Sequence, residues 1–96
     1  MANVRSANSY YVDSTGTLAV LGLSVYSILL TSNGGAGTLV LQDNATVPVT
    51  KLTLKVLNTE STLIDFNLMP ITFPNGIKVS TLTTALATIV FKEANR

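Results

Sequence analysis

Short segments in which apolar and polar residues alternate run along most of this chain, and turn residues separate them about every 8–12 positions. The clearest alternation lies in residues 49–57, where Leu52, Leu54 and Val56 are separated by Thr53 and Lys55. No window carries the period of about 3.6 residues that marks an amphipathic helix. About seven or eight short strands joined in this way predict an all-β fold, a single antiparallel β-sandwich or jelly-roll-like domain.

Alternation also predicts which side chains enter the core, because successive residues of a strand point to opposite faces. In residues 23–32 an uninterrupted alternation places Leu23, Val25, Ser27 and Leu29 on one face of the strand. It places Ser24, Tyr26, Ile28 and Leu30 on the other face. Both faces are partly apolar, so we expect this strand to be central and covered on both sides. In residues 62–68 the same rule points Ile64, Phe66 and Leu68 inward.

The beginning of the chain lacks this pattern. We therefore expect residues 1–12 to form an N-terminal arm and residues 13–96 to form the β-sandwich domain. The arm carries the apolar, aromatic and arginine side chains that are enriched at protein interfaces, and these are the candidate interface residues: Val4, Arg5, Tyr10, Tyr11 and Val12. The alternative is that residues 10–12 are the first strand of the sandwich, and that only residues 1–9 lie outside it.

Charged residues are scarce in this chain. They make up 11% of the 96 residues, against about 25% in an average domain, while 47% of the residues are hydrophobic. This balance excludes intrinsic disorder, and a net charge of +1 gives no strong attraction to nucleic acid or to acidic membranes. The most apolar stretch, residues 18–30, is too short for the roughly 20 residues of a helical membrane span. The scarcity of charge favours a subunit that hides surface against partners, and the alternative is a threonine-rich monomer.

The composition also removes most catalytic chemistry. There is no Cys and no His, which excludes thiol nucleophiles, thiolate metal sites and the commonest general base. Residues 13–16 (DSTG) differ from the Asp-Thr-Gly of aspartic proteases by one extra residue between Asp13 and Gly16, so a polar turn is expected there. The glycines at 34, 35 and 37 precede a strand and fit a hairpin loop better than a phosphate loop. We expect no enzyme, no cofactor and no metal site.

Three carboxylates remain as candidates for a calcium ion because they lie in turn regions: Asp13, Asp43 and Glu60. Their spacing shows no repeat and no EF-hand pattern. Solvated loop charges are the expected outcome.

Several segments of the chain resemble one class of viral protein. They are residues 22–31 (GLSVYSILLT), the glycine-rich hairpin, residues 38–44 (TLVLQDN), the strand at Asp65 and Phe66, residues 70–79 (PITFPNGIKV) and a last strand that ends at Phe91. Over about three quarters of its length the chain is similar to the small β-sandwich decoration (cement or head-auxiliary) proteins of tailed bacteriophages.

The resemblance implies a non-enzymatic structural protein of the virion. Such a subunit binds the outer capsid surface and stabilises contacts between capsomers, with the major capsid protein and other copies of itself as partners. A homo-oligomer, a trimer on a local three-fold position, is expected, with no nucleic acid or membrane partner. The alternatives are a phage tail or fibre adaptor and a carbohydrate-binding β-sandwich module.

Overall fold

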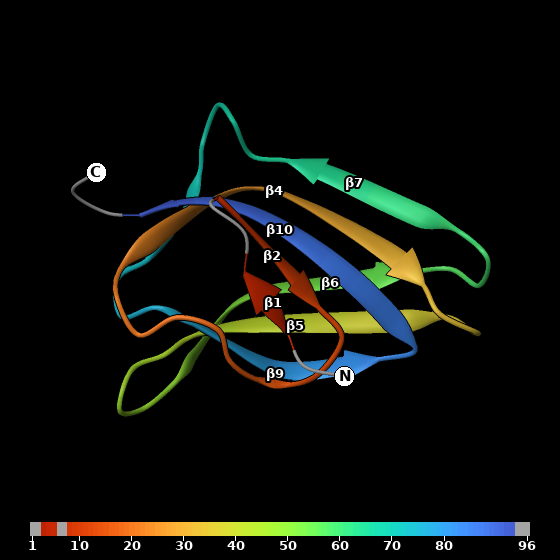
Figure 1. Cartoon of the computed structure of the whole chain (residues 1–96), viewed down its shortest axis with the longest axis horizontal. Coiled ribbons are helices and arrows are strands. Elements are labelled where there is room, and N and C mark those ends of the chain that lie inside the picture. The colour runs from red at the N-terminus through yellow and green to blue at the C-terminus, as the bar shows by residue number, and fades with distance from the viewer. Residues whose placement is uncertain (1–2, 6–7, 94–96) are drawn as a thin grey trace.

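Two antiparallel β-sheets make up this protein. A computed structural model describes residues 3–5 and 8–93, and those residues form ten strands. The six-stranded sheet contains β1 (Val4–Arg5), β2 (Ser9–Val12), β4 (Leu23–Ser32), β7 (Ser61–Asp65), β8 (Ile71–Phe73) and β10 (Ala85–Glu93). The four-stranded sheet contains β3 (Gly16–Thr17), β5 (Gly37–Asp43), β6 (Val49–Val56) and β9 (Ile77–Thr83). The expected all-β sandwich is confirmed (Figure 1).

The strands follow one another as a long hairpin that is folded over on itself. Its apex is the connection 44–48, and the pairs β5–β6, β4–β7, β3–β9 and β2–β10 lead away from that apex. These pairs alternate between the two sheets and give the orders β2-β10-β4-β7 and β3-β9-β5-β6. Eight strands arranged in this way have the strand order of a jelly roll.

The core lies between the inward faces of the two sheets. It is built from these buried side chains: Tyr10, Val12, Leu23, Val25, Ile28, Leu30, Leu39, Leu41, Leu54, Val56, Phe73, Ile77, Val79, Ala85, Ala87, Ile89 and Phe91. In β6 the expected alternation is confirmed, because Leu54 and Val56 are buried while Lys51 and Lys55 are exposed. Each inward side chain removes apolar surface from water at about 25 cal/mol per Å², which is the main stabilising contribution to the fold.

The alternation expected for residues 23–32 is wrong, because β4 contains a β-bulge. The register with β10 shifts between Val90, which pairs with Ser27, and Phe91, which pairs with Val25. Because Tyr26 is an extra residue in β4, every residue after it points to the opposite face of the sheet from the one that the alternation predicts. The buried residues of β4 are therefore Leu23, Val25, Ile28 and Leu30, and Leu29 is 39% exposed.

The inward position expected for Leu68 is also wrong. Both β7 and β8 pair with β4, and residues 66–70 leave the sheet between them. A turn closed by the Met69 N–H donating to the Phe66 carbonyl (2.9 Å) directs Leu68 and Met69 away from the body, where they are 99% and 81% exposed. Ile64 and Phe66 do pack against the core, as expected.

The expected arm does not extend to residue 12. Strand β2 pairs with β10 over Ser9–Val12, and Tyr10 and Val12 are buried in the core. The alternative is therefore right for residues 10–12, which lie in the first long-range strand pair, but wrong for Ser9 and for β1, which are also paired in the sheet. The alternation of β2 covers only four residues, which is too short to distinguish a strand from an aperiodic segment in the sequence. Residues 1–2 and 6–7 of the expected arm lie outside the described residues.

Gly76 and Gly34 provide a matched test of close backbone packing in this fold. Both have positive φ angles, 97° and 92°, but a Cβ at Gly76 would lie 2.0 Å from the Ala19 carbonyl oxygen, whereas a Cβ at Gly34 would meet nothing within 4 Å. We expect Gly34→Ala to lower the free energy of unfolding by about 1–2 kcal/mol through backbone conformation alone. Gly76→Ala must also displace the backbone at Ala19, so we expect it to cost more than about 3 kcal/mol in urea denaturation. Equal losses in the two variants would show that the contact with Ala19 is not a constraint.

Candidate functional site

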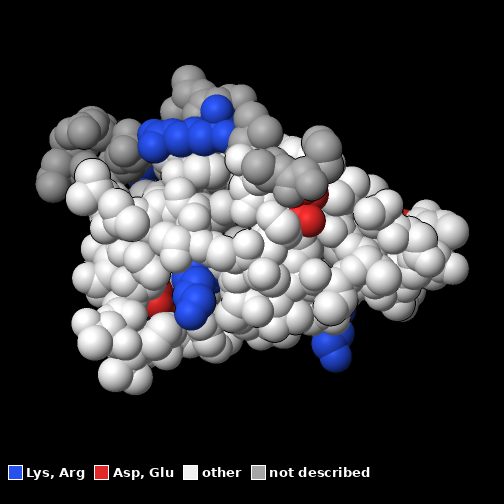
Figure 2. All heavy atoms as spheres, turned by 60° about the horizontal axis from the view of Figure 1, so that its bottom comes forward, with Lys and Arg blue, Asp and Glu red and all other residues white. Residues whose placement is uncertain are grey.

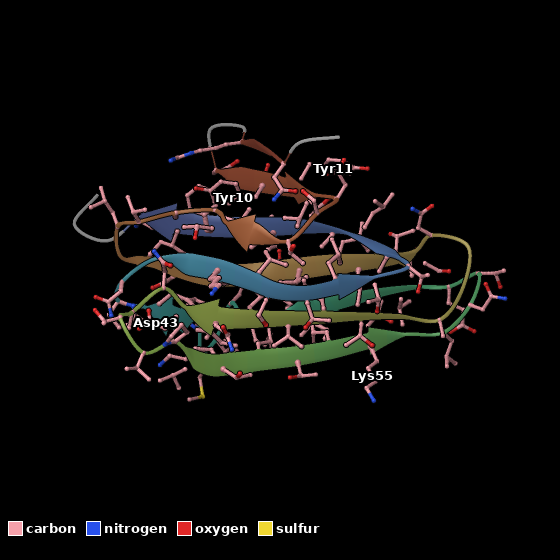
Figure 3. The ribbon with its side chains drawn as sticks, turned by 90° about the horizontal axis from the view of Figure 1, so that it is seen from below. Tyr10, Tyr11, Asp43 and Lys55 are labelled. Atoms are coloured by element: carbon pink, nitrogen blue, oxygen red, sulfur yellow. The ribbon has the colours of Figure 1, made fainter. Side chains whose placement is uncertain are left out.

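The five candidate interface residues at the N-terminus do not form one free surface. Tyr10 and Val12 are 4% and 0% exposed and belong to the core, while Tyr11 is 40% exposed on the opposite side of β2. The guanidinium of Arg5 lies 5.0 Å from the centroid of the Phe91 ring and 5.7 Å from that of Tyr10, and the two rings stack at 4.8 Å. The side chain of Val4 lies outside the described part of the structure. Arg5 and Tyr10 therefore hold β1 on the core edge, and Tyr11 remains exposed (Figure 3).

The candidate carboxylates are not brought together. Asp13 and Glu60 lie in connections at one end of the sandwich, and Asp43 lies at the other end. In the turn after β2, the Asn3 Oδ1 atom accepts hydrogen bonds from the backbone N–H groups of Asp13 (2.9 Å) and Ser14 (3.1 Å), so this segment is a capped turn. Within residues 3–5 and 8–93 no three His, Cys, Asp or Glu side chains form a group that could hold a metal ion.

A different surface carries unusual chemistry, namely the end of the sandwich at the left of Figure 1. Three connections lie at that end: residues 18–22 before β4, residues 44–48 between β5 and β6 at the bottom of the view, and residues 66–70 between β7 and β8 at its top. We call these three segments the loop end. Their tips expose large apolar side chains: Val20 72%, Leu21 65%, Val47 77%, Leu68 99% and Met69 81%.

No charged residue occurs in the three segments of the loop end. In Figure 2 the tip that projects at the lower left carries no blue or red atoms. Connections on a protein surface are usually polar, and isolated apolar residues there are ordinary, but several exposed apolar residues in charge-free connections at one end mark an interaction site. The centres of protein–protein interfaces show this depletion of charge.

A buried carboxylate holds two parts of this end together. Asp43, at the end of β5, is only 6% exposed and accepts two hydrogen bonds from Asn75, one from the backbone N–H at 3.0 Å and one from the side-chain amide at 2.8 Å. The next residue, Asn44, donates its N–H to the Gly76 carbonyl at 3.1 Å. These bonds fix the start of the 44–48 connection to the turn before β9 (Figure 3).

The backbone of the 18–22 connection is fixed to the same turn. The Ile77 N–H donates to the Ala19 carbonyl (3.1 Å), and the Leu18 N–H donates to the Ile77 carbonyl (2.8 Å). Gly22 lies so close to Pro74 that a Cβ would come within 2.9 Å of the Pro74 oxygen. The apolar tips of two connections are thus held before any partner binds, which reduces the entropy lost on association.

The loop end was not found from the sequence. The available signal was that residues 18–22, 44–48 and 66–70 contain Val, Leu and Met but no charge. Their convergence at one end follows from the jelly-roll order of the strands, which alternation alone does not specify.

The hydrogen bonds from Asn75 hold the pKa of the Asp43 carboxyl below its ordinary value of 3.8. A lowered pKa means that this carboxylate stabilises the fold fully above pH 3.8, and that its contribution is lost as the pH falls through the folded-state pKa. We expect Asp43→Ala to lower the thermal midpoint at pH 7 and to make stability less sensitive to pH below 3.8. Thermal unfolding between pH 7 and pH 2.5 measures both effects, with Glu60→Gln, an exposed carboxylate, as the control. An unchanged pH dependence in Asp43→Ala would contradict this role.

We find no helix in residues 3–5 and 8–93 with the length and hydropathy needed to cross a membrane. Comparisons with protein-family models, with curated proteins and with solved structures find no match for this chain.

Proposed function

We propose that this protein is a non-enzymatic structural subunit of a phage virion, which binds the outer surface of the head through the loop end and contacts the major capsid protein. The observation that carries the proposal is a set of exposed, charge-free loop tips at one end, with the 18–22 and 44–48 connections fixed by hydrogen bonds to residues 75–77. Such a surface is suited to a partner that is itself a folded and largely apolar protein surface.

The mechanism is preferential binding to the assembled shell. A subunit that binds across neighbouring capsomers, and not to loose ones, stabilises the assembly by mass action. Fixed loop tips serve this purpose because the bound geometry is already present in the free subunit.

Two further observations support the proposal. The chain contains no His and no Cys, so thiol nucleophiles and the commonest general base are missing. The strand orders β2-β10-β4-β7 and β3-β9-β5-β6 are those of the jelly roll, an architecture that occurs in viral capsid proteins and in lectins. This second point is an analogy of fold, and a fold alone does not determine function.

Leu21 and Leu57 provide a matched test of the loop end, because they are 65% and 67% exposed and lie at opposite ends of the sandwich. We expect Leu21→Asp to weaken binding to assembled heads at least about tenfold, because it places a carboxylate in an apolar contact. Leu57→Asp should bind like the unaltered protein. Co-sedimentation with heads assembled from the major capsid protein measures the affinity, and thermal unfolding confirms that both variants fold.

Mass spectrometry of purified virions separates this proposal from its alternatives. Recovery of the protein with heads supports decoration, whereas recovery with tails supports an adaptor. Binding to glycans without binding to particles supports the carbohydrate module. Equal binding of Leu21→Asp and Leu57→Asp to heads would overturn the role of the loop end.

A further inference from the structure

A second apolar surface lies on the outward side of the six-stranded sheet. The register pairs Tyr11 with Thr88, Thr88 with Leu29, and Leu29 with Leu63, so that one row of side chains crosses four strands. Residues paired in register on adjacent antiparallel strands project from the same face and contact one another. Tyr11, Leu29 and Leu63 are 40%, 39% and 68% exposed, which makes the row an apolar stripe open to solvent. We call the surface centred on this row the outer face.

The middle of the outer face carries no charge. The flanking rows hold small polar and apolar side chains: Ser9, Val90 and Ser27 on one side, and Leu86, Thr31 and Ser61 on the other. Among the described residues, charged side chains enter only at the border, where Asp65 ends one row and Lys92 follows beyond Val90. The uncharged area thus spans the width of β2, β10, β4 and β7.

The outward side of the four-stranded sheet has the opposite character. One row of this side pairs Lys55 with Thr38, and another pairs Lys78 with Gln42. The exposed Lys51 lies on β6 between these two rows. Three positive charges and many hydroxyl groups make this side well suited to water. The two sides of the sandwich therefore differ in the surface they can bury.

We propose that the outer face binds the same face of a second copy of this chain about a two-fold axis. In a two-fold contact the same patch is used by both subunits, so groups near the axis meet their own counterparts. On the four-stranded side this arrangement brings lysines against lysines, which is unfavourable. On the outer face it brings uncharged side chains together and removes Tyr11, Leu29 and Leu63 from water.

The outer face also has both a hollow and a projecting side chain, which a self-complementary contact needs. A shallow hollow of about 330 Å³ is lined by Asn8, Tyr26, Asn67, Val90, Phe91 and Lys92. Leu63 projects from β7 on the same side of the sheet, and it is the most exposed member of the row. A projecting leucine and a hollow on one surface allow each copy to fill space on the other.

The size of the outer face sets the expected strength of the pair. Four strands at about 4.8 Å spacing and three rows at about 7 Å spacing cover roughly 400 Å². A standard interface buries about 800 Å² on each partner, so we expect a dimer that dissociates in the micromolar range or above. Neighbouring sites on a shell raise the local concentration and favour such a weak pair.

The test is the oligomeric state in solution, which does not depend on any capsid. Sedimentation equilibrium of the unaltered chain at concentrations up to about 1 mM should show reversible dimers. Leu63→Asp should raise the dimer dissociation constant at least tenfold, because it removes the projecting leucine and buries a carboxylate in an apolar contact. Leu57→Asp is the matched control, since Leu57 is 67% exposed but does not belong to the outer face. Tyr11→Asp tests the other end of the row.

The outcomes separate this proposal from the proposed function. Dimers that are lost in Leu63→Asp and Tyr11→Asp but kept in Leu57→Asp and Leu21→Asp support pairing through the outer face, whether or not heads are bound. A chain that stays monomeric at about 1 mM, that forms trimers, or that loses dimers equally in Leu63→Asp and Leu57→Asp overturns it. Loss of head binding in Leu21→Asp with dimers intact shows that the two surfaces act independently.

Discussion

Burial of the inward faces of the two sheets against each other is the interaction on which the rest of this molecule depends. A lone hairpin such as β5–β6 is marginally stable in water, and it persists here because Leu39 and Leu54 pack against the other sheet. The same packing fixes where each strand ends. It thereby gathers residues 18–22, 44–48 and 66–70 at one end and presents Tyr11, Leu29 and Leu63 on one outward side.

The apolar residues that remain exposed are distributed unevenly over the surface of the molecule. A chain of 96 residues buries only about 60–65% of its unfolded surface, and with 47% hydrophobic residues some of them must stay outside. They are concentrated at the loop end and on the outer face, while threonines and Lys51, Lys55 and Lys78 lie on the other broad side. The molecule thus has one broad side rich in lysine and threonine and two distinct apolar surfaces.

The sequence predicted the fold where alternation was uninterrupted, as in residues 52–56 of β6, and misplaced residues where the backbone departs from a regular strand. The bulge at Tyr26 exchanges the faces of β4, and the turn that directs Leu68 outward depends on a hydrogen bond between Met69 and Phe66. Neither the bulge nor the turn can be recognised from the spacing of apolar and polar residues in the sequence. The loop end required the order of the strands, and the role of Asp43 required its approach to Asn75 across 32 positions of sequence.

The long hairpin that is folded over on itself also determines the order in which strands can pair during synthesis of the chain. Each strand pair farther from the apex at residues 44–48 joins segments more distant in sequence, and the most distant long pair is β2 with β10. Strand β2 is synthesised before β10, so its backbone pairs with β10 only after that later strand has left the ribosome. Until then Tyr10 and Val12, both buried in the finished fold, are open to water. Completion of the C-terminal strand thus closes the core, and a chain that stops before it leaves an apolar edge exposed to its neighbours.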